Sequence, residues 1–174
     1  MRKILLPLLY LLCGVGMLVL PRCAMAGWYL DSIKTASVIE IRGESADTTV
    51  AKAAGDRYVE DNLDYVLANN EWVAINFCAY WCGDCNNFTP AFQKASTQPE
   101  YAKIRWAHAD LDGVRGNENL RKRFNLPGTP TVILFHEGQI VRAPDGTPMI
   151  LDGHEGDKTY DDLVAYLTSY YKPH

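Results

Sequence analysis

The chain has 174 residues, of which 48% are hydrophobic, and it carries a net charge of −4. A chain of this length usually forms one domain, and this hydrophobic content is sufficient for a buried core. Runs of more than three Lys or Arg residues are absent from the sequence, which argues against nucleic acid or anionic lipid as a partner.

The N-terminal segment 1–26 has the features of a secretory signal. Basic residues precede an apolar stretch at 4–20, and Ala24-Met25-Ala26 supplies the small-x-small pattern that a signal peptidase cleaves. We therefore expect an exported protein, located in the periplasm. The alternative is an uncleaved membrane anchor, although Pro7 interrupts the apolar stretch, which is near the lower length limit for a span.

The next elements lead up to a strongly apolar strand. Residues 27–55 are expected to form an N-terminal extension with one short strand at 37–42. Apolar residues at helical spacing predict a helix within 56–70. Residues 72–78 form a nearly continuous apolar stretch, which is typical of a strand buried on both faces of a parallel sheet. We place the main domain at 56–174.

Helices and strands continue to alternate up to the C-terminus. The expected elements are a helix at 86–95, a strand at 103–111, a short helix at 117–124, a hairpin at 131–142 and a final helix at 157–171. Pro90 should kink the first of these helices, and Thr159 with Asp162 resembles a capping box before the last. This order predicts an α/β fold, with a mixed central sheet covered by helices on both faces.

Three cysteines, Cys78, Cys82 and Cys85, lie close together beyond the N-terminal segment. An odd number in one short stretch favours a local chemical site over a set of structural disulfides. A zinc site would need further ligands, which the scattered histidines do not supply. A disulfide that closes so small a loop would restrain the unfolded chain little.

The spacing of Cys82 and Cys85 suits thiol–disulfide exchange. Cys82 would stand at the N-terminus of a helix, where free N–H groups and the helix dipole lower the pKa of a thiol and make it a nucleophile. Cys85 lies one turn further on the same face. It could attack a mixed disulfide at Cys82 and release the substrate.

The segment 73–85 resembles the active-site segment of the thioredoxin family, in which a buried strand leads into Trp-Cys-x-x-Cys. Pro90 stands where that family kinks its active-site helix, and Gly128-Thr129-Pro130-Thr131 resembles the family's cis-proline loop. The resemblance extends over about residues 56–171. It implies a thioredoxin-like fold and a thiol–disulfide oxidoreductase that acts on protein cysteines.

The resemblance also implies roles for particular residues. Cys82 and Cys85 would form the catalytic dithiol–disulfide couple, and Trp81, Thr129 and a cis Pro130 would bind the substrate. The implied partners are cysteine-containing protein substrates and a thiol protein, soluble or membrane-bound, that donates electrons. No cofactor and no metal is implied.

Asn76 departs from the family pattern in a buried strand. Asn76 stands where many thioredoxins have a buried acid that helps to deprotonate the second cysteine, and Asn cannot ionise. Proton transfer at Cys85 is therefore expected to use water or another group, and His108 on the adjacent strand is a candidate. A strand histidine is more often a packed, hydrogen-bonded residue.

Gly83 and Asp84 occupy the positions between the active-site cysteines and are expected to tune their chemistry. A carboxylate at Asp84 disfavours a thiolate at Cys82 and stabilises the disulfide relative to the dithiol. We therefore expect a reducing or mid-range couple rather than a strong oxidant. The opposing interpretation is that Asp84 is solvated and has little influence.

Two alternatives remain open at this point. Cys78 is expected to face the interior as a small hydrophobic residue, but Cys78 and Cys82 could instead bind Cu(I), because thiolates suit that ion. The protein would then be a copper chaperone. The other alternative is a binding adaptor that keeps the fold without redox activity.

Overall fold

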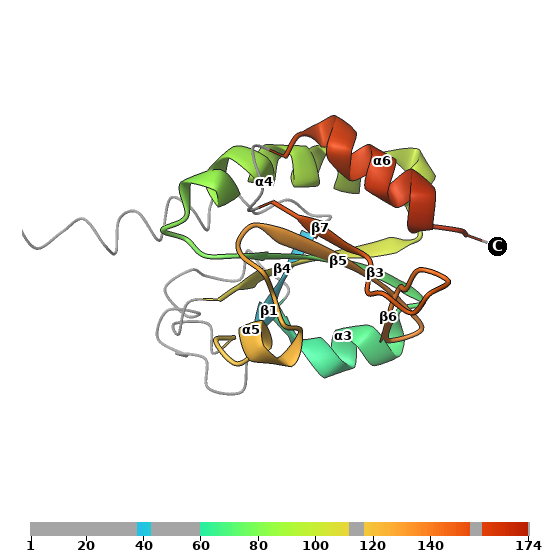
Figure 1. Cartoon of the computed structure of the whole chain (residues 1–174), viewed down its shortest axis with the longest axis horizontal. Helices are drawn as coiled ribbons and strands as arrows, with labels where there is room; N and C mark the ends of the chain where they lie inside the picture. The colour runs from blue at the N-terminus through green and yellow to red at the C-terminus, as the bar shows by residue number, and fades with distance from the viewer. Residues whose placement is uncertain (1–37, 43–59, 112–116, 154–157, 174) are drawn as a thin grey trace, which may run out of the picture.

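The computed structural model describes residues 38–42, 60–111, 117–153 and 158–173 (Figure 1). The expected signal segment 1–26, and the extension 27–55 apart from its strand, lie outside the described residues. Within the described part of the chain, no helix is long and apolar enough to cross a membrane.

The described elements alternate along the chain much as the sequence predicts. The strands are β1 (Val38–Arg42), β2 (Glu60–Asn62), β3 (Trp72–Cys78), β4 (Ile104–Asp110), β5 (Thr131–His136), β6 (Gln139–Ile140) and β7 (Ile150–Asp152). The helices are α3 (Leu63–Asn69), α4 (Gly83–Ser96), α5 (Leu120–Arg123) and α6 (Tyr160–Tyr170), with a 3₁₀ turn at Pro99–Tyr101.

The strands form one mixed sheet in the order β2-β1-β4-β3-β5, with β6 and β7 both paired to the outer edge of β5. The first four of these strands run parallel to one another, and β5 is antiparallel to β3. Strand β3 is therefore central and is hydrogen-bonded on both sides. The expectation of a mixed sheet with an antiparallel edge is confirmed.

Helices cover both faces of the sheet (Figure 1). Helices α4 and α6 lie together on one face, and α3 and α5 lie on the other. Successive side chains of a strand point to opposite faces, so β3 contributes Trp72 and Ala74 to the core under α4 and α6. Its Val73, Ile75 and Phe77 contribute to the core on the opposite face. All seven residues of β3 are buried, as its composition predicts.

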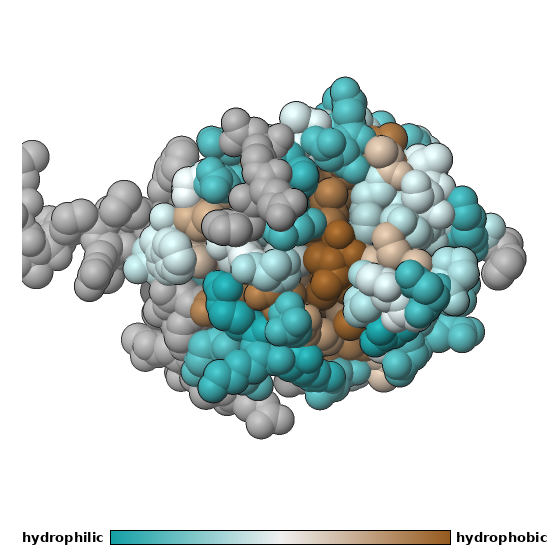
Figure 2. Space-filling view, in the orientation of Figure 1, coloured by the Kyte–Doolittle hydropathy of each residue, from teal (hydrophilic) through white to brown (hydrophobic). Residues whose placement is uncertain are grey.

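The surface follows this layered arrangement. In the space-filling view, the apolar surface of the visible face is concentrated over the sheet, between the two helical layers (Figure 2). Mostly polar residues cover the helices themselves. Two exposed large aromatic side chains stand out among the described residues, Tyr65 and Trp81, and Trp81 lies beside the cysteine pair.

The predicted helix at 56–70 is partly wrong. Glu60–Asn62 forms β2, which pairs in parallel with β1, and α3 begins only at Leu63. The stripe made by Leu63, Val66 and Leu67 is buried as expected. Strand β2 is polar and shows no apolar alternation, so its sequence does not indicate a strand. Its conformation is set by pairing with β1 at the edge of the sheet.

Other boundaries follow local chemistry that the sequence shows. The turn between β5 and β6 places Glu137 at φ 49° and Gly138 at φ 76°, which is the backbone that a two-residue hairpin requires. Thr159 and Asp162 form the predicted capping box at the start of α6. Helix α4 begins at Gly83, three residues before the predicted start, and Pro90 lies inside it.

Candidate active site

The cysteine pair lies where β3 leads into α4. Strand β3 ends at Cys78, and Cys82 is the N-cap residue of α4, with an extended backbone at φ −85° and ψ 117°. The N–H of Cys82 donates to the carbonyl of Ala79 at 2.9 Å, which closes the connecting turn. Cys82 therefore stands at the predicted helix N-terminus.

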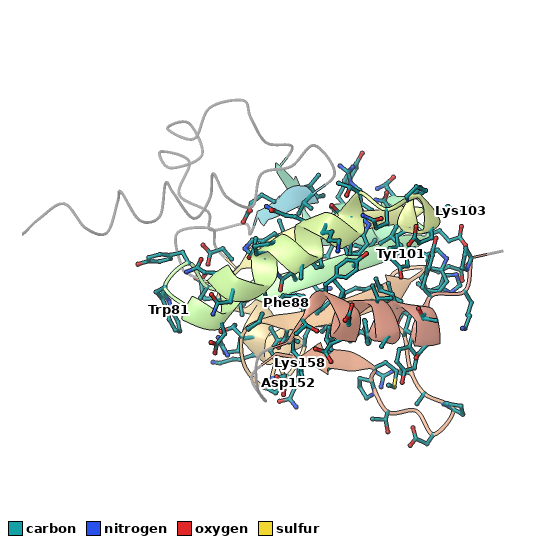
Figure 3. All side chains as sticks on the ribbon, turned by 90° about the horizontal axis from the view of Figure 1, so that it is seen from above. Trp81, Phe88, Tyr101, Lys103, Asp152 and Lys158 are labelled. Atoms are coloured by element: carbon teal, nitrogen blue, oxygen red, sulfur yellow. The ribbon has the colours of Figure 1, made fainter. Side chains whose placement is uncertain are left out.

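The two active-site sulfurs differ in access to solvent. Cys82 is 9% exposed, whereas Cys85 is fully buried in the first turn of α4. Trp81, next to Cys82, is 65% exposed and lies at the N-terminal end of α4 (Figure 3). Gly83 and Asp84 are also exposed. Cys82 thus keeps a small exposed fraction, whereas Cys85 has none.

The loop before β5 reaches the Cys82 sulfur from a distant part of the chain. The peptide bond between Thr129 and Pro130 is cis. The Cys82 thiol donates to the carbonyl of Thr129 at 3.5 Å, and the Thr129 hydroxyl donates to the Cys82 sulfur at 3.5 Å. The N–H of Gly153 donates to the carbonyl of Pro130 at 2.8 Å, which links this loop to the end of β7.

The environment of Cys82 raises the pKa of its thiol. Burial is the leading cause, and hydrogen bonds from the Thr129 hydroxyl and the Cys85 N–H lower the pKa in part. The N–H of Cys85 lowers the pKa in the direction predicted for a helix N-terminus, but burial outweighs it, so the predicted net lowering is wrong. The upward direction agrees with the one expected from Asp84, but it comes from burial and from Cys85, and that carboxylate is not among its causes.

The Cys85 sulfur lies among groups that can donate a hydrogen bond to its thiolate. The thiol of Cys78 is the leading cause of a lowered pKa at Cys85, and burial opposes it. The N–H of Ala79, the thiol of Cys82 and the hydroxyl of Thr129 lower the pKa further. A negative charge on the buried sulfur is thus stabilised by groups at the end of β3, in the turn that follows it and in the loop before β5.

Cys78 and Asn76 lie on one face of β3 and contact each other. The Cys78 thiol donates to Oδ1 of Asn76 at 3.3 Å, and both residues are fully buried. Asn76 is directly opposite His108 on β4, and His108 is in turn opposite Glu40 on β1. Asn76, His108 and Glu40 are buried and form a polar row across three strands.

This row contains His108, which the sequence places near Asn76, and Glu40, which the sequence did not identify. His108 shares the sheet face of Asn76, as expected, and it lies on the same face as Cys78. Glu40 is the missed residue. Its signal was a carboxylate between Ile39 and Ile41 in a short apolar strand, where buried neighbours on both sides make solvation of the charge difficult.

A metal site at the cysteines would need further ligands nearby. Within the described residues, no group of three or more His, Cys, Asp or Glu side chains is placed to hold a metal ion. Cys78 contacts Asn76 and Cys85 instead. The arrangement lends no support to the copper chaperone alternative.

Comparisons with known proteins agree with this geometry. The thioredoxin family model matches residues 56–167. The chain is 30% identical over 108 residues to protein disulfide isomerase-like 1-3 of Arabidopsis thaliana, covering 62% of this chain and 16% of that protein. It is 36% identical over 125 residues to protein disulfide-isomerase erp38 of Neurospora crassa, covering 70% and 31% respectively.

A solved structure shows the same fold. A mutant thioredoxin of Halobacterium salinarum superimposes with a TM-score of 0.54 at 24% identity, covering 80% of this chain and 98% of that one. The chain spans less than a third of the length of the two curated relatives named above. The family match nevertheless covers well over half of this chain and includes both active-site cysteines. This chain therefore belongs to the thioredoxin family.

Proposed function

We propose that the protein exchanges disulfides with the cysteines of other proteins through Cys82 and Cys85. The observation that carries this proposal is the different exposure of the two cysteines, since Cys82 keeps a small exposed fraction and Cys85 has none. The Cys82 thiolate attacks a substrate disulfide, which forms a mixed disulfide and releases one substrate thiolate. Cys85 then attacks the Cys82 sulfur, which forms the Cys82–Cys85 disulfide and releases the second substrate thiol.

The surface around Cys82 supports recognition of an extended substrate segment. The backbone of Thr129 is in contact with the Cys82 sulfur, and Pro130 follows it through the cis bond. An extended segment could pair with this backbone as a short additional strand. Trp81 is exposed beside the pair and offers an apolar platform for the same segment.

The opposite pKa shifts at the two cysteines support a reducing or mid-range couple. A thiolate at Cys82 is not stabilised, because the pKa of this thiol is raised, so Cys82 does not stabilise the reduced form of the couple. The lowered pKa at Cys85 stabilises the reduced form and acts in the opposite direction. Strong oxidants owe their potential to a stabilised reduced form, with potentials of about −120 mV. A measured potential near that value, from equilibration with glutathione, would contradict this part of the proposal.

The N-terminal sequence supports export. Segment 1–26 carries the signal pattern, and an oxidising compartment such as the periplasm would supply protein disulfides as substrates. Each turnover leaves Cys82 and Cys85 oxidised, so the cycle requires a thiol protein that returns two electrons. Fractionation of cells that produce the full chain would test the location.

Trapping of mixed disulfides tests the central proposal. The Cys85→Ser variant lacks the resolving thiol, so covalent adducts of Cys82 with substrate proteins should accumulate. They should disappear on reduction, and they should be absent from the matched Cys82→Ser/Cys85→Ser variant. If the single variant forms no adducts and the unaltered protein does not reduce a disulfide substrate such as insulin, the proposal is wrong and the adaptor alternative is favoured.

A further inference from the structure

Cys78 is a third thiol in the active site that the two-cysteine reaction does not use. It is the last residue of β3, it is fully buried, and it packs in one cluster with Ala79, Cys82 and Cys85. Its thiol donates to Oδ1 of Asn76. It is reduced in this structure, as are Cys82 and Cys85.

Cys85 is the member of the cluster that both other thiols reach. Cys85 packs in one cluster with Cys78 and Cys82, and both of these thiols interact with its sulfur. The sulfur of Cys82 contacts Thr129 and Cys85, and it lies nearer the surface than either buried thiol. The arrangement thus places Cys85 between two candidate disulfide partners, one on β3 and one at the helix N-cap.

We propose that Cys85 forms two alternative disulfides, one with Cys82 and one with Cys78. This inference rests on the proposed Cys82–Cys85 couple and adds an exchange within it. The Cys78 thiolate attacks the Cys85 sulfur of the Cys82–Cys85 disulfide, the Cys78–Cys85 bond forms, and the electron pair of the broken bond leaves on Cys82. The proton lost by Cys78 is taken up by the released Cys82 thiolate, so no oxidant or reductant is consumed.

The exchange changes what the site can do. With Cys85 bonded to Cys78, Cys82 is again a thiol at the surface and can attack a substrate disulfide. The resulting mixed disulfide cannot be resolved by Cys85, because that sulfur is already bonded. The Cys78–Cys85 form therefore holds its substrate covalently, whereas the Cys82–Cys85 form turns over.

The cost of the second disulfide lies in the polar contact that Cys78 gives up. The buried Oδ1 of Asn76 loses the thiol that donates to it, and Nδ2 of Asn76 already has no hydrogen-bond partner within the described residues. A buried polar group left unsatisfied is destabilising. We therefore expect Cys78–Cys85 to be the minor disulfide of the unaltered chain.

Peptide mapping distinguishes the two disulfides directly. Chymotrypsin cleaves after Tyr80 and Trp81, so it separates Cys78 from the peptide that holds both Cys82 and Cys85. The full chain is oxidised with diamide under native conditions, quenched with acid, alkylated with N-ethylmaleimide and purified as the monomer on a non-reducing gel. The Cys82–Cys85 bond then appears within one peptide, whereas the Cys78–Cys85 bond links two peptides and leaves Cys82 alkylated.

The expected result is a linked peptide pair as a minor product of the unaltered chain. This pair should increase several-fold and become the main product in Cys82→Ser, and it should be absent from the matched Cys78→Ala variant. If monomers of the unaltered chain and of Cys82→Ser contain no linked pair while the Cys82–Cys85 bond forms normally, the inference is wrong and the proposed function stands. If no disulfide forms among the three cysteines, the proposed function fails as well.

Discussion

Gly153 approaches the loop of Pro130 so closely that a methyl group cannot be added without movement. A Cβ atom at this position would lie 2.6 Å from Cγ of Pro130, 2.6 Å from its carbonyl oxygen and 3.1 Å from its Cδ. Two of these atoms belong to a rigid ring and one to the backbone, so rotation of a side chain cannot relieve the contacts. Gly153→Ala must therefore displace the loop that carries Thr129 and Pro130.

The size of the displacement follows from these distances. Ordinary van der Waals contact begins near 3.4 Å, so a contact of 2.6 Å requires movement of about 0.8 Å. Overpacking of this kind costs about 1–3 kcal/mol of folding stability. The same movement alters the 3.5 Å contacts between Thr129 and the Cys82 sulfur. Since a misplacement of about 1 Å can cost on the order of 100-fold in rate, we expect Gly153→Ala to slow insulin reduction by about 10-fold or more.

Urea denaturation and a steady-state insulin assay measure the two effects. Gly83→Ala serves as a control for stability, because an added Cβ there meets no atom within 4 Å. Gly153→Ala should lower the free energy of unfolding and the rate together, and Gly83→Ala should leave the free energy of unfolding unchanged or slightly higher. A Gly153→Ala variant that matches the unaltered protein in both measurements would refute the argument that this glycine fixes the loop.

Two further substitutions and one alkylation experiment have expected outcomes. Tyr166→Phe removes a buried hydroxyl that accepts from the N–H of Leu134 at 2.9 Å, so it should lower the free energy of unfolding in urea by about 1–3 kcal/mol; an unchanged value would contradict the prediction. Thr159→Ala removes the α6 cap and should cost about 1 kcal/mol at neutral pH. Hydrogen bonds from Thr159 hold the pKa of Asp162 below its unfolded value. The folding stability that these bonds contribute is present above the unfolded pKa and is lost as the pH falls through the folded pKa. The loss of folding stability in Thr159→Ala should therefore be smaller in acid than at neutral pH. An equal loss at acidic and neutral pH would count against the capping box. Because burial raises the pKa of Cys82, its alkylation by iodoacetamide should still accelerate at pH values where an exposed thiol has reached its plateau; an earlier plateau would show that burial does not dominate.

The central strand and the active-site turn could be predicted because the signals are local. The nearly continuous apolar stretch of β3 has no stable alternative to burial on both faces. Glu137-Gly138 encodes a hairpin through its own backbone preferences. Cys82 follows a strand and precedes a helix in the sequence itself, so its place at the N-cap required no knowledge of distant contacts.

The features that escaped prediction depend on partners far along the chain. Strand β2 is polar, and it is a strand because β1 offers it a pairing edge. The burial of Glu40 follows from the register that sets it opposite His108. The raised pKa of Cys82 has the same origin, because the burial that outweighs the helix N-terminus comes from the packed tertiary structure rather than from its neighbours in sequence.

The unequal exposure of Cys82 and Cys85 also constrains the kinetics of a full cycle. A thiol that arrives from solvent finds only the sulfur of Cys82 within reach, whichever protein carries it. Substrate and electron donor must then use one surface in turn, and no complex can contain both at the reacting sulfur. Initial rates measured at several donor concentrations should accordingly give parallel double-reciprocal lines, the pattern of a ping-pong reaction.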